Sequence, residues 1–315
     1  MVKLSLGDSY ENTVIPEKIR AYGDITKPAS SIGVMAAIPF ASIIYGELYS
    51  SGGPEFLLQN LWTVVYASVT IMLLHGGSQA LNMAEDAEAD RQTDHKQNRP
   101  IPAGVISEEE ARSLAWIFIS VGLARAFTIT SSFGIFALVL AFNGVFYNLD
   151  PIRAKERLWV NVGWQAASRG LLLYPASFAI WGDPLNQVAW AMGLLSFFLV
   201  LSMQQTADFN DAEIDEKFGI ITPAVYHDFN SLISIMAGIV LTMFAFMLWF
   251  VSLQIIPNFW SLFILVIPIA WSLYYLWDKP GGVSNVSGQS PTWYIFYLCL
   301  ASMYILPAVQ LMLEV

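Results

Sequence analysis

Long apolar runs alternate with short polar segments along almost the whole chain. A bilayer core about 30 Å thick needs about 20 mostly apolar residues per helical crossing, because every buried backbone group must be bonded within its own helix. The runs are too long for transmembrane strands and show no sustained two-residue alternation. We therefore predict an all-α integral membrane protein with nine transmembrane helices, over residues 30–49, 60–84, 111–129, 131–149, 158–181, 187–207, 230–254, 259–277 and 292–313.

Prolines fall inside four of these runs, at Pro39, Pro175, Pro268 and Pro307. Neighbouring helices can satisfy the backbone groups that a proline frees, so we expect kinks rather than breaks. The segment before the first run, residues 1–29, is polar and lacks the apolar stretch of a secretory signal, so we expect no cleavage. Its end, IPEKIRAYGDITKPAS, predicts a short interfacial helix. We expect residues 1–315 to form one membrane-embedded domain.

Composition supports the membrane assignment. Of the 315 residues, 56% are hydrophobic and 13% are charged, whereas soluble domains carry about 25% charged residues. We expect membrane lipid and no nucleic acid among the partners. The net charge of −10 adds little to the prediction of topology, because acids contribute weakly to it. Cys299 is the single cysteine, which excludes an intramolecular disulfide.

The fifteen Lys and Arg residues predict the orientation, because short cytoplasmic loops carry an excess of bases. Apart from Arg125 and Arg169, which lie inside predicted helices, all of them precede the first helix or lie between helices 2 and 3, 4 and 5, 6 and 7, or 8 and 9. The intervening loops on the other side contain none. We therefore expect a protein of the cell membrane with a cytoplasmic N-terminus and an outside C-terminus.

Two groups of acids stand at the cytoplasmic ends of predicted helices. Asn82, Asp86 and Asp90 are four residues apart and share one stripe of a helix that continues out of the second crossing. After the sixth crossing, three aspartates follow three- and four-residue steps and share a face in the same way: Asp208, Asp211 and Asp215. Either group by itself is also compatible with a solvated helix end, but two matched groups on one side favour a common cavity.

Oxygen ligands without Cys and with few His residues suit Mg²⁺ rather than zinc or copper. Mg²⁺ usually binds one or two carboxylates together with substrate phosphates. Bases that could contact a diphosphate stand beside both groups and after the fourth helix: Arg91, Lys96, Arg99, Arg153, Lys155, Arg157 and Lys217. For each single base, the orientation of the chain is an equally good explanation.

These residues resemble the UbiA superfamily of intramembrane prenyltransferases. Its members carry an NxxxDxxxD motif after helix 2, followed by an RPIPSG-like stretch, and here these are Asn82, Asp86, Asp90 and NRPIPAG. A second aspartate motif ends helix 6 in the family and is similar to Asp208, Asp211, Asp215 and Gly219. YNLDPIRAKERLWVN, which contains Tyr147, looks like the family's tyrosine and basic segment. Met83 replaces a second acid that many members have.

The resemblance implies a helical bundle around a central cavity, with a cytoplasmic cap of loops and short helices. It implies that Mg²⁺ is held by Asp86, Asp90, Asp208, Asp211 and Asp215, with Asn82 assisting. The ions would bind an isoprenyl diphosphate, and ionisation to an allylic cation would release pyrophosphate. Positively charged catalytic residues such as Arg99 would lie beside the pyrophosphate. A lipophilic acceptor would then capture the cation. A terpene cyclase of the same superfamily would need the same motifs but no acceptor, and the two remain open.

Other residues are candidates for the cavity wall. Aromatic faces stabilise cations, so Tyr147, Trp164 and Tyr174 could shield the allylic cation, although packing is the more common role of such residues. Arg169 stands near mid-membrane, where a charge is costly and usually faces a cavity or a partner. His75 precedes Asn82 by two turns and could contact substrate, although a hydrogen-bonded interior histidine is the more common case. A transporter would instead place its acids near mid-membrane, which argues against that class.

Overall fold

The computed structural model describes residues 16–50, 52–93, 96–209, 211–278 and 291–314. Over these residues the chain is helical, and its only strand-like feature is a single bridge between Arg157 and Ile221. Seven helices are long and apolar enough to cross a membrane, which identifies an integral membrane protein: α5 (Leu61–Glu85), α7 (Glu108–Ile129), α8 (Ser131–Asn148), α11 (Gln187–Met203) extended to Ala207, α14 (Phe229–Ser252), α15 (Val266–Asp278) with the preceding turn from Trp260, and α16 (Pro291–Glu314).

The shorter helices lie between these spans: α1 (Glu17–Asp24), α2 (Pro28–Met35), α3 (Ala37–Tyr49), α4 (Gly53–Gln59), α6 (Ala87–Arg91), α9 (Leu158–Ala166), α10 (Leu173–Ala179), α12 (Ala212–Lys217) and α13 (Pro223–Tyr226). Helix α1 occupies the segment predicted to form a short helix before the first crossing. Two of the nine predicted transmembrane helices are interrupted. Residues 30–49 are divided between α2 and α3, and residues 158–181 contain α9, a π-helical turn at Ala167–Leu171, and α10.

Three of the prolines explain where these helices change. A proline ring clashes with the carbonyl group four residues before it, and α2 ends at Met35, four residues before Pro39. The π-helical turn ends at Leu171, four residues before Pro175. A 3₁₀ turn, Trp260–Leu265, precedes α15, and Pro268 lies in the first turn of α15. Pro307 alone lies inside one continuous helix, α16. Only α16 therefore runs unbroken through its proline, whereas the other three prolines accompany a change of helix type or a helix end.

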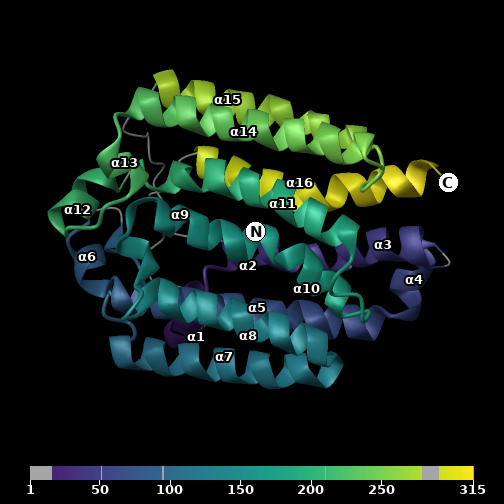
Figure 1. Ribbon diagram of the computed structural model, residues 1–315. Coiled ribbons are helices and arrows are strands. Elements are labelled where there is room, and N and C mark those ends of the chain that lie inside the picture. The colour runs from purple at the N-terminus through teal and green to yellow at the C-terminus, as the bar shows by residue number, and fades with distance from the viewer. Residues whose placement is uncertain (1–15, 51, 94–95, 210, 279–290, 315) are drawn as a thin grey trace.

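The long helices run side by side across the molecule (Figure 1), with α6, α12 and α13 together at one end. Glycines let α5 approach α7 closely. A Cβ atom on Gly77 would lie 2.9 Å from the Ala115 carbonyl oxygen, and one on Gly122 would lie 2.8 Å from the Leu74 side chain. Small residues at such contacts allow the backbone-to-backbone packing that stabilises membrane helices.

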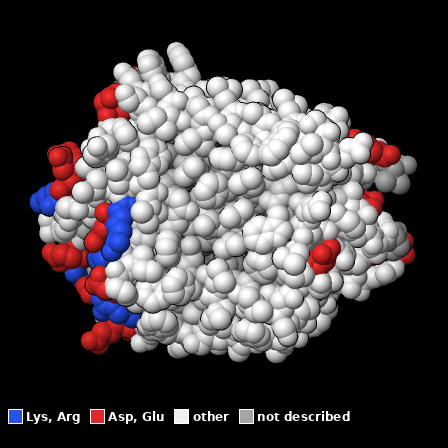
Figure 2. Space-filling view, viewed as in Figure 1, with Lys and Arg blue, Asp and Glu red and all other residues white. Residues whose placement is uncertain are grey.

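Charged side chains are distributed unequally between the two ends of the molecule. On the face shown in Figure 2, Lys and Arg gather at the end that carries α6 and α12, and the opposite end shows acids only. Lys3 and Lys279, which also entered the prediction of orientation, lie outside the described residues. On this face, the bases that the sequence places in alternate loops therefore lie together at one end of the molecule.

Candidate active site

A cavity of about 250 Å³ lies among the helices, and both aspartate groups contribute to its wall. The predicted site residues that line it are His75, Asn82, Asp86, Asp90, Lys96, Arg99, Tyr147, Lys155, Arg169, Asp208, Asp211 and Asp215. They come from α5, α6, α8, the π-helical turn, α12 and three connecting segments that are far apart in the sequence. The fold therefore places the two motifs at one site.

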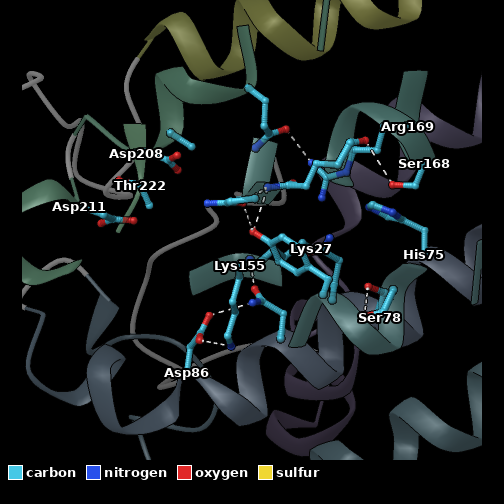
Figure 3. Close-up of a pocket in the computed structure, with 18 of the residues that line it drawn as sticks. Lys27, His75, Ser78, Asp86, Lys155, Ser168, Arg169, Asp208, Asp211 and Thr222 are labelled. Atoms are coloured by element: carbon cyan, nitrogen blue, oxygen red, sulfur yellow. Dashed lines mark hydrogen bonds and ion pairs between the residues drawn. The ribbon is translucent and has the colours of Figure 1, made fainter. Parts of the chain in front are cut away.

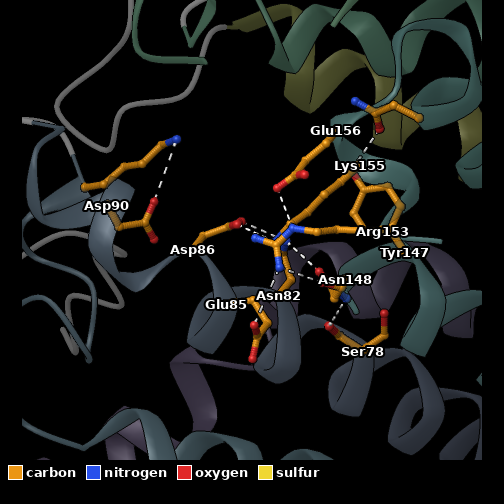
Figure 4. A network of polar contacts seen from close by, with 12 residues as sticks. Ser78, Asn82, Glu85, Asp86, Asp90, Tyr147, Asn148, Arg153, Lys155 and Glu156 are labelled. Atoms are coloured by element: carbon orange, nitrogen blue, oxygen red, sulfur yellow. Dashed lines mark hydrogen bonds and ion pairs between the residues drawn. The ribbon is translucent and has the colours of Figure 1, made fainter. Parts of the chain in front are cut away.

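The first aspartate group keeps the helical stripe that its spacing predicts. The Asp86 N–H donates to the Asn82 carbonyl at 3.0 Å, and the Asp90 N–H donates to the Asp86 carbonyl at 2.8 Å, so the stripe continues from α5 into α6. The Asn82 amide donates to Asp86 Oδ2 at 2.8 Å, and Lys155 Nζ donates to Asp86 Oδ1 at 2.5 Å (Figure 4). Burial favours a higher pKa for Asp86, but the Lys155 ammonium, together with Lys27 and Lys96, outweighs it and lowers the pKa below the usual value.

Asp90 is the most deeply buried acid of this group, with 1% of its surface exposed. Its Oδ2 atom accepts from Arg99 Nη1 at 2.6 Å, and Lys96 Nζ lies 3.8 Å from Oδ1. Lys96 Nζ also donates to Asp211 Oδ2 at 2.8 Å. Because Lys96 contacts both groups, the segment after α6 connects the first aspartate motif with the second.

The second aspartate group also forms one helical face. The Asp211 N–H donates to the Asp208 carbonyl at 3.2 Å, and the Asp215 N–H donates to the Asp211 carbonyl at 2.8 Å. Asp208 and Asp215 form no ion pair with any described residue. Burial, together with repulsion from the neighbouring aspartates, raises the pKa of Asp208 well above its usual value and raises the pKa of Asp215 to about 7. Asp208 and Asp215 therefore lack the positively charged partners that would stabilise their ionised carboxylates.

This donor set fits a cation that is shared with a ligand. Within the described parts of the chain, no three His, Cys, Asp or Glu side chains converge closely enough to enclose a metal ion by themselves. Mg²⁺ does not need such an enclosure, since it usually binds one or two carboxylates together with waters and phosphate oxygens. The uncompensated aspartates Asp208 and Asp215 are the carboxylates that an added cation would stabilise most.

The site should respond to pH through Asp215. Because its pKa is raised to about 7, the carboxyl group carries a proton below that pH, and this proton must leave before the oxygen can bind a cation. We expect the apparent Mg²⁺ affinity of the purified protein to fall about tenfold between pH 8 and pH 6 for one displaced proton. Titrating Mg²⁺ against the thermal unfolding midpoint of the protein at each pH measures this affinity. Asp215→Asn should flatten the profile, and an unchanged profile in that variant would contradict the assignment.

Tyr147 and His75 are held by polar partners inside the cavity. Tyr147 Oη donates to Asn161 Oδ1 at 2.9 Å and accepts from Gln165 Nε2 at 2.9 Å. His75 Nε2 lies 2.8 Å from Ser30 Oγ. Both rings are thus fixed in orientation beside the space that a substrate would occupy.

Six residues predicted to contact substrate do not line the cavity. The four bases among them contact other groups: Arg91 pairs with Glu108 at 2.8 Å, Arg153 pairs with Glu156, Arg157 donates to the Pro151 carbonyl at 3.2 Å, and Lys217 donates to Gln92 at 2.9 Å. A direct diphosphate contact therefore has no support for these four, and their place in the loops is explained by orientation.

The other two, Trp164 and Tyr174, were wrongly expected at the cavity wall. Trp164 Nε1 donates to the Asn143 carbonyl at 2.7 Å, so its ring packs between α9 and α8. Tyr174 is fully buried, donates to the Met303 carbonyl at 2.7 Å and stacks on Tyr304 with ring centroids 4.2 Å apart. Packing, the commoner role of aromatic residues in membrane helices, accounts for both.

Lys27 is a site residue that the sequence interpretation treated only as an orientation signal. It lines the cavity, and its Nζ donates to Asn82 Oδ1 at 3.2 Å. Burial, with repulsion from Arg99, lowers the pKa of Lys27 to about 7. Its position directly before Pro28, where a helix opens, was the available signal. Gln204 and Tyr297 also line the cavity and carried no motif.

Comparison with known proteins identifies the family to which this arrangement belongs. A model described as the UbiA prenyltransferase family matches residues 40–290. The chain belongs to this family. The resemblance predicted from the two aspartate motifs is thereby confirmed.

Several UbiA-family relatives resemble the chain at moderate identity. A protoheme IX farnesyltransferase of Archaeoglobus fulgidus is 26% identical over 133 residues, which are 42% of this chain and 42% of the relative, so less than half of that relative is matched. A digeranylgeranylglyceryl phosphate synthase of Methanoregula boonei is 27% identical over 210 residues, 66% of this chain and 68% of the relative. The structure of a UbiA homolog from A. fulgidus bound to GPP and Mg²⁺ shares the fold, with a TM-score of 0.65 and 18% identity over 92% of this chain and 99% of that chain.

Proposed function

We propose that this UbiA-family chain transfers a prenyl group from an isoprenyl diphosphate to a lipophilic acceptor inside the membrane, with Mg²⁺ as cofactor. The observation that carries the proposal is the meeting of two aspartate groups with Lys27, Lys96, Arg99 and Lys155 in one cavity. Acids that can hold a metal ion and bases that can contact phosphate are both needed to bind a diphosphate. The names of the relatives and the Mg²⁺ and GPP in the related structure support this assignment.

The aspartates and the bases have separate roles in the proposed reaction. Asp86, Asp90, Asp208, Asp211 and Asp215, assisted by Asn82, would hold Mg²⁺, which supplies Lewis-acid stabilisation of the departing pyrophosphate. Ionisation of the carbon–oxygen bond leaves an allylic cation and adds negative charge to the leaving group. Four bases already contact these motif residues: Lys155 contacts Asp86, Arg99 contacts Asp90, Lys96 contacts Asp211, and Lys27 contacts Asn82. Their preorganised positions would stabilise that charge as it develops.

The remaining wall of the cavity suits a hydrocarbon chain. Apolar side chains from four helices line it: Val34, Ile71, Leu74, Leu140 and Leu173. Tyr147, Trp293 and Tyr297 add aromatic faces to the same wall. Apolar surroundings would bind the prenyl tail, and aromatic faces would stabilise the allylic cation until the acceptor captures it.

We further propose one membrane-embedded domain with nine crossings. In addition to the seven uninterrupted spans, α2 with α3 and α9 with α10 would each cross as an interrupted helix. Broken helices are tolerated at membrane depth where they border a cavity, and both segments contribute residues to the cavity wall. The bases at the end near α6 and α12 (Figure 2) favour a cytoplasmic N-terminus, a cytoplasmic active site and cap, and an outside C-terminus.

The experiment that tests the function is pyrophosphate release by the purified protein in detergent. Geranyl diphosphate and longer isoprenyl diphosphates are supplied with a lipid extract, with Mg²⁺ or with EDTA. We expect release with Mg²⁺ that falls to background with EDTA and returns when Mg²⁺ is restored, because the aspartates then lack the ion they share with the diphosphate. Release that is indifferent to EDTA would overturn the metal-dependent mechanism. A cyclic hydrocarbon formed without extract would replace the transferase by a cyclase.

A further inference from the structure

Arg169 occupies an unusual backbone position in the cavity wall. It lies in the π-helical turn Ala167–Leu171, where the Leu172 N–H donates to the Ala167 carbonyl at 2.9 Å. Single π-helical turns inside helices are rare and are frequent at functional sites. The turn is also held firmly against α11, since a Cβ atom on Gly170 would lie 2.6 Å from the Phe197 backbone. The direction of the Arg169 side chain is therefore set by close helix packing.

Arg169 has no counter-charge within the part of the chain that the structure describes. Its Nη1 donates to Gln204 Oε1 at 2.8 Å and to Tyr297 Oη at 3.1 Å, and both partners are neutral. No acid among the described residues forms an ion pair with it. A charged side chain inside a membrane-spanning segment usually faces either a counter-charge or a cavity. Arg169 faces the cavity.

The guanidinium also has donors to spare. Nε and Nη2 have no hydrogen-bond partner among the described residues, and neither is sealed off by neighbouring atoms. A guanidinium with two adjacent free nitrogens presents the geometry that binds carboxylate or phosphate in a bidentate manner. The surroundings provide further neutral hydrogen-bonding groups, from Ser168, His75 and Ser78, which gather on the same side of the cavity (Figure 3).

The aspartate groups occupy the other side of the cavity in the same view, with Asp208, Asp211 and Asp86 on that side and Lys155 and Lys27 between. Those bases contact the aspartate motifs directly, whereas Arg169 contacts none of the aspartates. The diphosphate thus has its own set of bases, and Arg169 is left for a second anion.

We propose that Arg169 binds an anionic group, carboxylate or phosphate, on the acceptor, and so selects an anionic lipophile over a neutral one. The proposal rests on the proposed function in that it takes the aspartate side of the cavity as the diphosphate site. It assigns the acceptor's charged end to the side of the cavity formed by Arg169, Ser168 and His75. The acceptor's reacting atom would then point toward the aspartate side, where the allylic cation forms.

The test measures binding with three small probes of similar size: benzoate, phenyl phosphate and the neutral benzamide. Half-saturation is read from the shift in thermal unfolding of the protein in a non-ionic detergent. We expect at least one anion to bind about tenfold more tightly than benzamide, and Arg169→Gln to remove that preference, because one bidentate charged contact is lost. The anion that binds more tightly distinguishes a carboxylate from a phosphate acceptor.

Two further variants make the result specific. Arg169→Lys keeps the charge and the fold but loses the planar fork, so its anion binding should be weaker than that of the wild type. Arg125→Gln is the matched control, because Arg125 is the other intramembrane arginine, lies over the Tyr66 ring at 3.6 Å and does not line the cavity. It should leave anion binding unchanged.

Failure of this proposal is separable from failure of the proposed function. Geranyl diphosphate binding with Mg²⁺ should be the same in Arg169→Gln as in the wild type. Lost diphosphate binding in that variant would instead make Arg169 part of the diphosphate site and overturn the inference. Equal binding of all three probes by the wild type, or unchanged anion preference in both Arg169 variants, would overturn it as well. In each case Mg²⁺-dependent pyrophosphate release reports independently on the function.

Discussion

Asp86→Asn is expected to lower Mg²⁺-dependent pyrophosphate release by at least about 100-fold, the size of effect seen when one preorganised charge-stabilising group is removed from an active site. Asp86 accepts from Asn82 and from Lys155, and its pKa is lowered, so it is a carboxylate at neutral pH. Asparagine keeps the shape of the side chain, but its single amide oxygen can accept from only one of these two donors, and the substitution removes the negative charge that would hold Mg²⁺. Initial rates at saturating geranyl diphosphate and a lipid extract measure the loss.

The matched control for this variant is Glu88→Gln. Glu88 is on the same short helix, α6, but its side chain is 71% exposed, and its polar contacts among the described residues are with Arg91 and Gln92. We expect its rate to stay within about twofold of the wild type, because an exposed pair contributes little. Both variants should elute as single species from size exclusion. Wild-type turnover in Asp86→Asn would exclude the first motif from metal binding.

Arg99→Ala should lower the free energy of unfolding more than any other substitution proposed for this protein. The Asp90 side chain is 2% exposed, and removal of Arg99 would leave its carboxylate with only Lys96 Nζ, at 3.8 Å. Breaking a buried ion pair by removing one partner costs about 3–5 kcal/mol, because the remaining charge is desolvated and poorly compensated. The partial compensation by Lys96 favours the lower end, about 3 kcal/mol, and the midpoint of thermal or SDS-induced unfolding measures it.

A double-mutant cycle identifies the cause of that loss. In Asp90→Ala/Arg99→Ala both charges are absent, so the double variant should unfold at a higher midpoint than Arg99→Ala alone, although it lacks activity. Additive effects of the two substitutions would contradict the ion-pair explanation. Such a result would indicate that Arg99 stabilises the loop through packing of its aliphatic stem.

Much of the fold could be predicted from the sequence, for physical reasons that particular segments illustrate. The apolar residues of α14 predict a membrane-spanning helix without any knowledge of neighbouring helices, because each helix that crosses a bilayer must satisfy its own backbone hydrogen bonds. The step of four between Asn82, Asp86 and Asp90 likewise survives in the helical hydrogen bonds of α5 and α6. The capping box of Ser107 and Glu110 forms at the start of α7 as a local consequence of its sequence.

The interruptions of helices were less predictable. Pro39 and Pro175 marked possible kinks, yet whether a proline bends a helix or ends it depends on which neighbours can accept or replace the lost hydrogen bond. The π-helical turn at Arg169 ends four residues before Pro175, but it also lies against α11, and that contact is not encoded in the local sequence. Trp164 and Tyr174 show the same limit, since the side of a helix that faces a cavity is set by the packing of all its neighbours.

By itself, the sequence determined that the chain lies in a membrane, which end of the molecule carries the bases, and that two aspartate motifs recur at helix ends, because hydrophobicity, charge and helical spacing are properties of single segments. Only the tertiary structure decided which bases meet those motifs. Lys96, Arg99 and Lys155 contact the aspartates and Lys27 contacts Asn82, whereas the other four predicted bases contact other groups: Arg91, Arg153, Arg157 and Lys217. It also left Arg169 facing the cavity with unused donors. Ion pairs form across loops that are distant in sequence, and their distances depend on how the helices between them pack.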